Sequence, residues 1–566
     1  MRARLLLIAA ACAVALGCTA VLRAADAPDS PPVLKIAQGE IRGKMDAGAA
    51  AYLGIPFAAP PTGPLRWKPP RLPATWTGVR DCTQFGPACP QPSGLGIQRD
   101  VGKQDEDCLS LNVWTTVDAA ASVDAASPPR SQNPKTTDAA RTPRLQPVMV
   151  WIHGGGCTTG AGSLPFYNGA ALAKAGVVVV TVNYRLGPLG YLAHPLLSKE
   201  SGEGVSGNYG HLDQIAALRW VQANIAAFGG DPECVTIFGE SAGALSVCRL
   251  MISPQAKGLF HRAIAQSGGA HGRNRHLRKR TGRLESMEEV GEQVAARLGC
   301  DKGGDVLAAM RAKTPAELLA ATNPAQGLFG KGIKFAPIVD GWTIPDDAGK
   351  LFEQGKFHRV PMMLGSNADE GTMFLQQLPV NRAFGYRLTV RLLFEEQADT
   401  LLRLFPVQRD EDVKDALNKL VTVSAFVWPA RQIAESMARH GGRAYLYHFT
   451  RVPPIEAARK LGAFHGLEIA YAFGNLREGA GFNETDRKLS AEMMARWTRF
   501  ATAGDPNGRD LPAWPAYNPQ ADPYMEFGDA CAMKTGLYKE ACEAIAERKR
   551  AAETPGPSAT KKTNRR

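Results

Sequence analysis

The sequence lacks the residue patterns that mark several functional classes. None of its Cys and His residues has the spacing of a zinc site. The glycine run at 154–156 is not followed by the Gly-Lys-Ser/Thr of a phosphate-binding loop. Beyond the N-terminus, no apolar stretch is long enough to cross a membrane, and there is no internal repeat. We therefore expect no metal, no organic cofactor and no stable membrane span in the mature chain.

Positive charge is concentrated in two short segments. The formal net charge is +12 for 566 residues. Residues 272–283 hold six Arg or Lys and no acid, and residues 547–566 hold seven basic residues against two acidic ones. The rest of the chain is close to neutral. Basic segments can bind anionic surfaces, but this distribution favours a solvated loop and tail, so we expect no nucleic-acid partner.

The N-terminus has the layout of a secretory signal. Arg2 and Arg4 precede an apolar run from Leu5 to Leu22, and cleavage near Ala25 fits the small residues there. We therefore expect a signal peptide at 1–25 and a secreted, periplasmic or cell-envelope protein. Cys18 follows a segment that loosely resembles a lipoprotein signal, so a lipid anchor at Cys18 is the alternative.

Export makes disulfide bonds a reasonable expectation for some of the eleven cysteines. Cys89 and Cys108 bracket a short loop and are the first pair we expect. Cys531 and Cys542 could close a second loop. The remaining cysteines of the mature chain are expected to be small buried apolar residues, namely Cys82, Cys157, Cys234, Cys248 and Cys300.

Strand and helix patterns alternate along residues 26–546. Val177–Val182 is a continuous β-branched run, typical of a strand covered on both faces. This alternation predicts an α/β domain with a large, mostly parallel central sheet and helices on both faces. The other expected strands are Leu111–Thr115, Val148–Ile152, Val235–Phe238, Arg262–Ala265, Met362–Leu364 and Tyr445–Phe449, and the expected helices include Leu212–Phe228 and Ala242–Met251.

Two segments fall outside this regular pattern. Residues 117–146 are rich in Ala, Asp, Ser, Pro and Thr and are predicted to form a low-complexity surface insertion. Residues 547–566 are predicted to form a disordered basic tail.

Ser241 lies in the strongest motif of the chain, Gly239-Glu240-Ser241-Ala242-Gly243. The motif follows an expected strand and begins an expected helix, which is the context of a nucleophile elbow. A side chain at either glycine would collide with the neighbouring strand or helix. Without that context, the same pattern is an ordinary glycine-rich turn.

A second motif, His153-Gly154-Gly155-Gly156, directly follows the strand that ends at Ile152. Backbone N–H groups of such a loop can stabilise the tetrahedral oxyanion of ester hydrolysis, each by about 3 kcal/mol. The residue after the nucleophile, Ala242, would supply a further N–H. The competing interpretations are a flexible loop or a phosphate cradle.

A serine nucleophile needs a base, and the base needs an orienting acid. Of the ten histidines, His465 lies in a loop after the strand Tyr445–Phe449, with glycines at 462 and 466. Because the order in this kind of site is nucleophile, acid, histidine, the acid is expected between 241 and 465. The residues themselves do not choose between Asp369 and Glu370. Other histidines compete for the role of base, namely His153, His211, His261 and His448.

Several motifs in order resemble those of the type-B carboxylesterases, a family that includes the cholinesterases. The matching segments span roughly residues 33–530 and include Tyr52–Phe57, Pro64–Trp67, Glu106–Asn112, Gly207–Gly210, Phe228–Pro232, Gln266–Gly268 and Trp514–Pro515. The resemblance implies the α/β-hydrolase fold and a serine carboxylesterase that forms an acyl-enzyme.

The resemblance also implies a set of site residues. Ser241 would be the nucleophile, Glu370 the acid, since it immediately precedes Gly371, and His465 the base. The oxyanion donors would be the N–H groups of Gly155, Gly156 and Ala242. The pair Cys89–Cys108 would correspond to the first disulfide loop of the family.

The chain also departs from the family pattern. Its loop between Cys89 and Cys108 has no Trp, so a choline-ester specialist is not expected. Cys157 replaces the usual aromatic residue after the glycines, which would reshape the pocket. The expected partner is therefore a small-molecule ester. The alternatives are a non-catalytic adhesion or binding protein on the same scaffold and a peptidase with the same triad.

Overall fold

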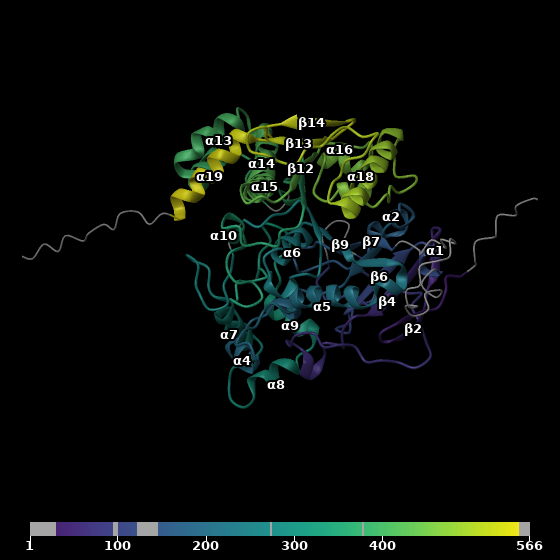
Figure 1. Ribbon diagram of the computed structural model, residues 1–566. Helices are drawn as coiled ribbons and strands as arrows, with labels where there is room; N and C mark the ends of the chain where they lie inside the picture. The colour runs from purple at the N-terminus through teal and green to yellow at the C-terminus, as the bar shows by residue number, and fades with distance from the viewer. Residues whose placement is uncertain (1–29, 94–99, 122–144, 272–273, 376–377, 554–566) are drawn as a thin grey trace, which may run out of the picture.

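A large mixed sheet runs through the centre of the protein, with helices packed around it (Figure 1). The computed structural model describes residues 30–93, 100–121, 145–271, 274–375 and 378–553. The predicted signal peptide and most of the predicted insertion lie outside these ranges, so both remain predictions. At its edges the insertion contributes helix α1 (Val117–Ala121) and the first residue of strand β7 (Gln146–Ile152).

Eleven strands of the described residues form the main sheet, in the order β14-β13-β12-β11-β10-β9-β7-β8-β6-β4-β3. Neighbouring strands from β8 to β13 are parallel, and the pairings at both edges are antiparallel. The remaining strands are β3 (Lys44–Asp46), β4 (Ala49–Pro56), β6 (Ser110–Thr115), β8 (Val178–Val182), β9 (Gly230–Glu240), β10 (Arg262–Gln266), β11 (Met362–Asn367), β12 (Ala444–Phe449), β13 (Pro523–Phe527) and β14 (Cys531–Thr535). The prediction of a mostly parallel α/β sheet is confirmed, and every strand expected from the sequence is present.

The sheet separates two hydrophobic cores. All five residues of β8 are buried, as its unbroken β-branched run predicts. Val178 and Val180 belong to one core, with side chains of α5 (Tyr209–Asn224) and α6 (Ala242–Leu250). Val179 belongs to the other, with side chains of α18 (Glu484–Ala503). Because alternate strand residues face opposite sides, both faces of the sheet are covered.

The other helices connect the strands and cover the sheet. They are α2 (Ala170–Lys174), α3 (Gly187–Tyr191), α4 (Pro195–Glu200), α7 (Met287–Arg297), α8 (Val306–Arg311), α9 (Pro315–Thr322), α10 (Ala348–Glu353), α11 (Thr372–Leu375), α12 (Ala383–Phe394), α13 (Ala398–Leu404), α14 (Val413–Thr422), α15 (Trp428–Arg439), α16 (Glu456–Leu461), α17 (Glu468–Ala472) and α19 (Lys539–Glu553). A small separate sheet joins β1 (Leu34–Ile36), β2 (Gly39–Arg42) and β5 (Val79–Asp81). None of the helices in the described ranges combines the length and apolar character needed to cross a bilayer.

The C-terminal helix corrects one predicted boundary. The tail was expected to be disordered from residue 547, but α19 continues to Glu553 and packs beside α13 (Figure 1). Ala541, Ile545 and neighbouring side chains are buried against the protein. The next turn is rich in Ala, Glu, Lys and Arg, which are strong helix formers, so the helix extends past its last buried residue. The rest of the predicted tail, 554–566, lies outside the described residues.

Candidate active site

Ser241 occupies a strained turn between β9 and α6. Its backbone has φ 57° and ψ −119°, and its side chain makes no capping hydrogen bond to the helix. A Cβ at Gly239 would lie 2.6 Å from the carbonyl oxygen of Ile152, and one at Gly243 would lie 2.0 Å from it. Both glycines are therefore required by the close approach of β7, as the sequence predicts, and the turn leaves the serine hydroxyl uncapped.

The glycine loop after β7 lies directly beside this turn. Strand pairing places Ile152 opposite Gly239, so the loops that follow the two strands meet at one edge of the sheet. A Cβ at Gly154 would lie 3.2 Å from the Cβ of Ser241. Gly155 has φ +107°, and a Cβ there would lie 2.1 Å from the carbonyl oxygen of Thr159. The backbone can reach Ser241 this closely only because these residues lack side chains.

Three backbone N–H groups near Ser241 have no protein acceptor within the described residues. They belong to Gly155, Gly156 and Ala242, and all three residues line the same cavity as Ser241. The Gly155 carbonyl, by contrast, accepts bonds from the N–H groups of Thr158 and Thr159 at 3.1 and 3.0 Å. Unpaired N–H groups that converge beside a serine can hold a negatively charged oxygen.

His465 is bound to Glu370. Its Nδ1 lies 2.5 Å from Oε2 of Glu370, whose side chain is fully buried. The other carboxylate oxygen, Oε1, accepts a 2.7 Å hydrogen bond from the Asn367 N–H at the end of β11. The rings of Phe374 and Phe426 each lie 5.0 Å from the imidazole, centroid to centroid. The carboxylate and the two rings fix the orientation of the histidine.

Asp369, the alternative acid, has a different contact. Its Oδ2 accepts a 2.8 Å hydrogen bond from the N–H of Ala463, and its Oδ1 accepts one of 2.8 Å from Asn418. A Cβ at Gly462 would collide with the Asp369 carboxylate at 2.1 Å. Asp369 therefore holds the loop that carries His465, while Glu370 contacts the imidazole.

The four competing histidines lie outside the cavity lining. His153 is buried and stacked on Tyr184 at 4.4 Å, and burial lowers its pKa to about 4. Burial likewise lowers the pKa of His211 to about 3 and that of His448 to about 4. His261 accepts a hydrogen bond from the N–H of Val235 in β9. Of the described histidines proposed as a base, His465 is the one that lies with Ser241.

Two buried carboxyl groups near His465 were not assigned a role from the sequence. Oε1 of Glu240, the residue before Ser241, lies 3.1 Å from Nε2 of His465. Glu468 accepts hydrogen bonds from Gln266 at 3.2 Å and from Asn367 at 2.5 Å. Glu240 was visible as the charged residue inside the Gly-x-Ser-x-Gly motif, and Glu468 lies three positions after His465. Neither position reveals a buried contact without the fold.

These carboxyl groups alter the electrostatics of the histidine. Burial alone would lower the pKa of His465, but the charges of Glu240 and Glu370 outweigh burial and raise that pKa above its usual range. Burial raises the pKa of Glu240, and the neighbouring Glu468 and Glu370 raise it further against the opposing effect of His465. Burial also raises the pKa of Glu468, to about 7. The carboxyl groups and the imidazole therefore influence one another's protonation.

A cavity of about 600 Å³ borders both the turn that carries Ser241 and the loop that carries His465. Ser241, His465 and the glycine loop line one part of it, together with Phe374 and Phe426. Phe426 comes from η8 (Val423–Val427), a π-helical turn between α14 and α15. Cys157, which has φ 56°, also lines the cavity, so the position where the family pattern has an aromatic residue does border the pocket.

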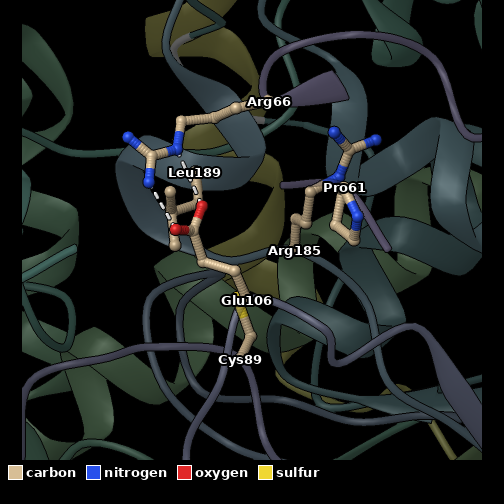
Figure 2. A pocket seen from close by; sticks show the side chains of 6 residues that line it. All are labelled: Pro61, Arg66, Cys89, Glu106, Arg185 and Leu189. Atoms are coloured by element: carbon tan, nitrogen blue, oxygen red, sulfur yellow. Dashed lines mark hydrogen bonds and ion pairs between the residues drawn. The ribbon is translucent and has the colours of Figure 1, made fainter. Parts of the chain in front are cut away.

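The structure has Cys89 and Cys108 as free thiols, contrary to the predicted disulfide. Both are buried, and they lie close enough for a hydrogen bond between the two thiols, which is the largest cause of the raised pKa of Cys108. Figure 2 shows Cys89 beside the ion pair of Arg66 with Glu106. The space between these side chains is close to 0 Å³, so it has no room for a ligand.

The five cysteines that were expected to be buried follow the prediction with one difference. Cys82, Cys157, Cys248 and Cys300 are buried, whereas Cys234 is partly exposed. Cys531 and Cys542 are free thiols as well, so the second suggested pair is not formed in this structure.

The chain is similar to known proteins in both sequence and structure. The profile of the group described as "Carboxylesterase family" matches residues 30–545. A protein named Fumonisin B1 esterase, from Sphingopyxis macrogoltabida, is 37% identical over 533 residues, which covers 92% of this chain and 91% of that protein. Carboxylesterase 1C from Rattus norvegicus is 34% identical over 544 residues, covering 88% of this chain and 90% of that protein.

Solved structures of esterases are also similar to this chain. The carboxylesterase EST55 from Geobacillus stearothermophilus superposes with a TM-score of 0.75 at 32% identity, covering 91% of this chain and 99% of that one. A PNB esterase structure superposes with a TM-score of 0.73 at 30% identity, with the same coverage.

Proposed function

The chain belongs to the carboxylesterase family and is an ester-hydrolysing enzyme, and we propose that it works through a Ser241–His465–Glu370 triad and an acyl-enzyme intermediate. The observation that carries this proposal is the 2.5 Å contact between His465 Nδ1 and Glu370 Oε2 beside a cavity that Ser241 also lines.

In the first half of the reaction, Ser241 Oγ attacks the ester carbonyl carbon as Nε2 of His465 takes the hydroxyl proton. Nε2 faces the turn that carries Ser241, since it lies 3.1 Å from the preceding residue, Glu240. The C=O bond opens to a tetrahedral oxyanion. Collapse of this intermediate breaks the bond to the alcohol oxygen, and His465 returns the proton to the leaving alcohol.

The second half repeats these steps with water. His465 removes a proton from water, the resulting oxygen attacks the acyl carbon, and the proton then returns to Ser241 as the carboxylic acid leaves. In both halves the N–H groups of Gly155, Gly156 and Ala242 hold the oxyanion. Their lack of a protein acceptor in the described residues supports this role, because the donors are free for the developing charge.

Glu370 orients the base and stabilises its charged form. With Nδ1–H donated to Oε2 of Glu370, Nε2 is left as the nitrogen that can accept the proton of Ser241. Burial of Glu370 and its second bond from the Asn367 N–H keep the carboxylate in place.

The test is hydrolysis of 4-nitrophenyl acetate by the wild type and by Ser241→Ala. We expect the variant to lose at least about 1000-fold in kcat while keeping the circular dichroism spectrum and Tm of the wild type. Retention of most activity would remove Ser241 from its role. A folded wild type that turns over no ester would instead favour the non-catalytic binding protein.

We also propose that the chain is exported and loses residues 1–25. The proposal rests on the sequence pattern alone, since these residues lie outside the described ranges. N-terminal sequencing of protein recovered from the medium or periplasm tests it, and a lipid attached at Cys18 would support the alternative anchor.

A further inference from the structure

We propose that the cavity binds esters that carry a carboxylate group, which Arg249, Arg275 and Lys334 hold away from the scissile bond. The inference rests on the proposed function and specifies the substrate class of the same site. All three cations line the cavity that contains Ser241.

Arg249 is a buried cation without a counter-charge. It is 8% exposed, and no described carboxylate forms an ion pair with it. Its Nη1 donates to the Leu245 carbonyl at 3.2 Å, and its Nη2 donates to Asn274 Oδ1 at 3.1 Å. A guanidinium has five N–H donors, so most of them remain available. A buried, unpaired charge is costly, and an anion in the adjoining cavity would remove that cost.

Arg275 and Lys334 add two more cations to the same part of the cavity. The one side-chain hydrogen bond of Arg275 within the described residues is a weak contact to Met287 Sδ at 3.6 Å. Lys334 forms no ion pair with a described residue either. Lys334 is exposed to solvent but lines the cavity, and desolvation together with the charge of Arg275 lowers its pKa. Neighbouring like charges without a counter-ion favour the binding of an anion.

The contrast with two other cations of the basic segment 272–283 supports this interpretation. Arg278 lies 3.2 Å from Glu288, and Arg280 donates to Glu289 at 2.8 Å, so these two cations are neutralised on the surface. Arg275 comes from the same segment but faces the cavity. The segment predicted to be only a solvated loop therefore also supplies a wall of the pocket.

The carboxyl groups near the cavity contact residues other than these three cations. Of the described residues that line it, Glu240 is the one with a carboxyl group, and it lies against His465. Asp347 is separated from Arg249 by the amide of Asn274, which contacts both. His271 also lines the cavity, with its Nε2 3.5 Å from Glu353. No described carboxylate therefore neutralises the three cations directly.

Helix α6 sets the distance between the Arg249 guanidinium and Ser241. The Leu245 N–H donates to the Ser241 carbonyl, and Arg249 donates to the Leu245 carbonyl, so the guanidinium lies one to two helical turns from Ser241. At 5.4 Å per turn, the separation is on the order of 5 to 10 Å. A carboxylate several bonds from the ester carbonyl would reach it.

The experiment compares kcat/KM for esters that differ only in charge. The acyl arm uses 4-nitrophenyl monoesters of glutaric and adipic acid against the matching carboxamides. The alcohol arm uses 4-acetoxybutanoate against 4-acetoxybutanamide. We expect the wild type to prefer the carboxylate by about tenfold in one arm, which identifies the side of the ester that carries the charge, and the preference to fall as salt screens the interaction.

The variants Arg275→Gln and Lys334→Gln are each expected to lower this preference ratio by about three- to tenfold. Lys331→Gln is the matched control, because Lys331 is an exposed lysine close in sequence that does not line the cavity. Its ratio should equal that of the wild type. Since Arg249 is buried and its loss could affect folding, the test relies on the other two positions.

A wild type that hydrolyses neutral esters but shows no preference for the carboxylate in either arm would overturn the inference. So would equal ratios for Arg275→Gln, Lys334→Gln and Lys331→Gln. Both results would leave the proposed function intact. That function fails separately if no ester is hydrolysed, or if hydrolysis survives Ser241→Ala.

Discussion

Nδ1 of His465 lies 2.5 Å from Oε2 of Glu370, although 95 positions separate the two residues in the chain. The neighbouring carboxylate, Asp369, binds the backbone of the histidine loop instead. Two adjacent acids thus have distinct contacts, one with the imidazole and one with the loop that carries it.

This division predicts different consequences for two substitutions. Glu370→Gln should lower kcat by about 10³- to 10⁴-fold, because the amide no longer stabilises the imidazolium. Asp369→Asn should mainly cost stability, about 1–2 kcal/mol, because it weakens the bond to the Ala463 N–H. Steady-state kinetics and chemical denaturation of both variants measure the difference. A larger loss of kcat in Asp369→Asn would mean that the wrong carboxylate is assigned to the histidine.

The raised pKa of His465 predicts the pH dependence of Glu240→Gln. Activity requires neutral His465, so kcat/KM should rise with pH as the imidazole loses its proton. Removing the charge of Glu240 removes a cause of the raised pKa, and the acidic limb of the profile should move to lower pH. Glu478→Gln, an exposed position, is the control and should leave the profile unchanged. A limb that stays in place, or moves to higher pH, in Glu240→Gln would contradict the electrostatic assignment.

The glycine loop predicts different effects for two alanine substitutions. Gly155→Ala should lower kcat by at least about 100-fold, because its Cβ would lie 2.1 Å from the Thr159 carbonyl and displace an oxyanion donor. Gly156→Ala meets no atom within 4 Å, so its expected cost is backbone strain at φ +65°, about 1 kcal/mol. Kinetics and thermal melts should rank the two variants in this order. Equal losses of kcat would argue against a specific role for the Gly155 position.

The two adjacent thiols give a redox prediction. Cys89 and Cys108 are both buried and within hydrogen-bonding reach of each other, so oxidation should join them and close a loop of about 20 residues, raising stability by about 3 kcal/mol. Thiol counting by alkylation and mass spectrometry, with and without reductant, measures the pairing. Cys89→Ala should abolish the gain. Thiols that stay free under oxidising conditions would mean that the pairing expected from the sequence does not occur.

The strands and the nucleophile turn could be predicted because their signals are local. The β-branched run of β8 and the spacing of Gly239, Ser241 and Gly243 depend on neighbours along the chain. The choice between Asp369 and Glu370 could not be made from the residues themselves, because it depends on how β11 approaches the loop that carries His465. The resemblance to the carboxylesterases favoured Glu370, and the observed contact agrees with it.

The features that the sequence did not predict also depend on contacts between distant parts of the chain. Glu240 and Glu468 become important only because the fold buries them against His465. Arg275 was part of a segment whose composition suggests a solvated loop, and its position in the cavity wall depends on contacts with distant elements. The start of the disordered tail was placed too early, at residue 547, because helix propensity in α19 continues beyond the last buried residue.

The most direct test of the central claim is the mass of the protein after reaction with a fluorophosphonate. The wild type should gain one adduct, mapped by peptide sequencing to Ser241, and Ser241→Ala should gain none under the same conditions. An adduct at another residue, or equal labelling of the two proteins, would contradict the assignment of Ser241 as the nucleophile.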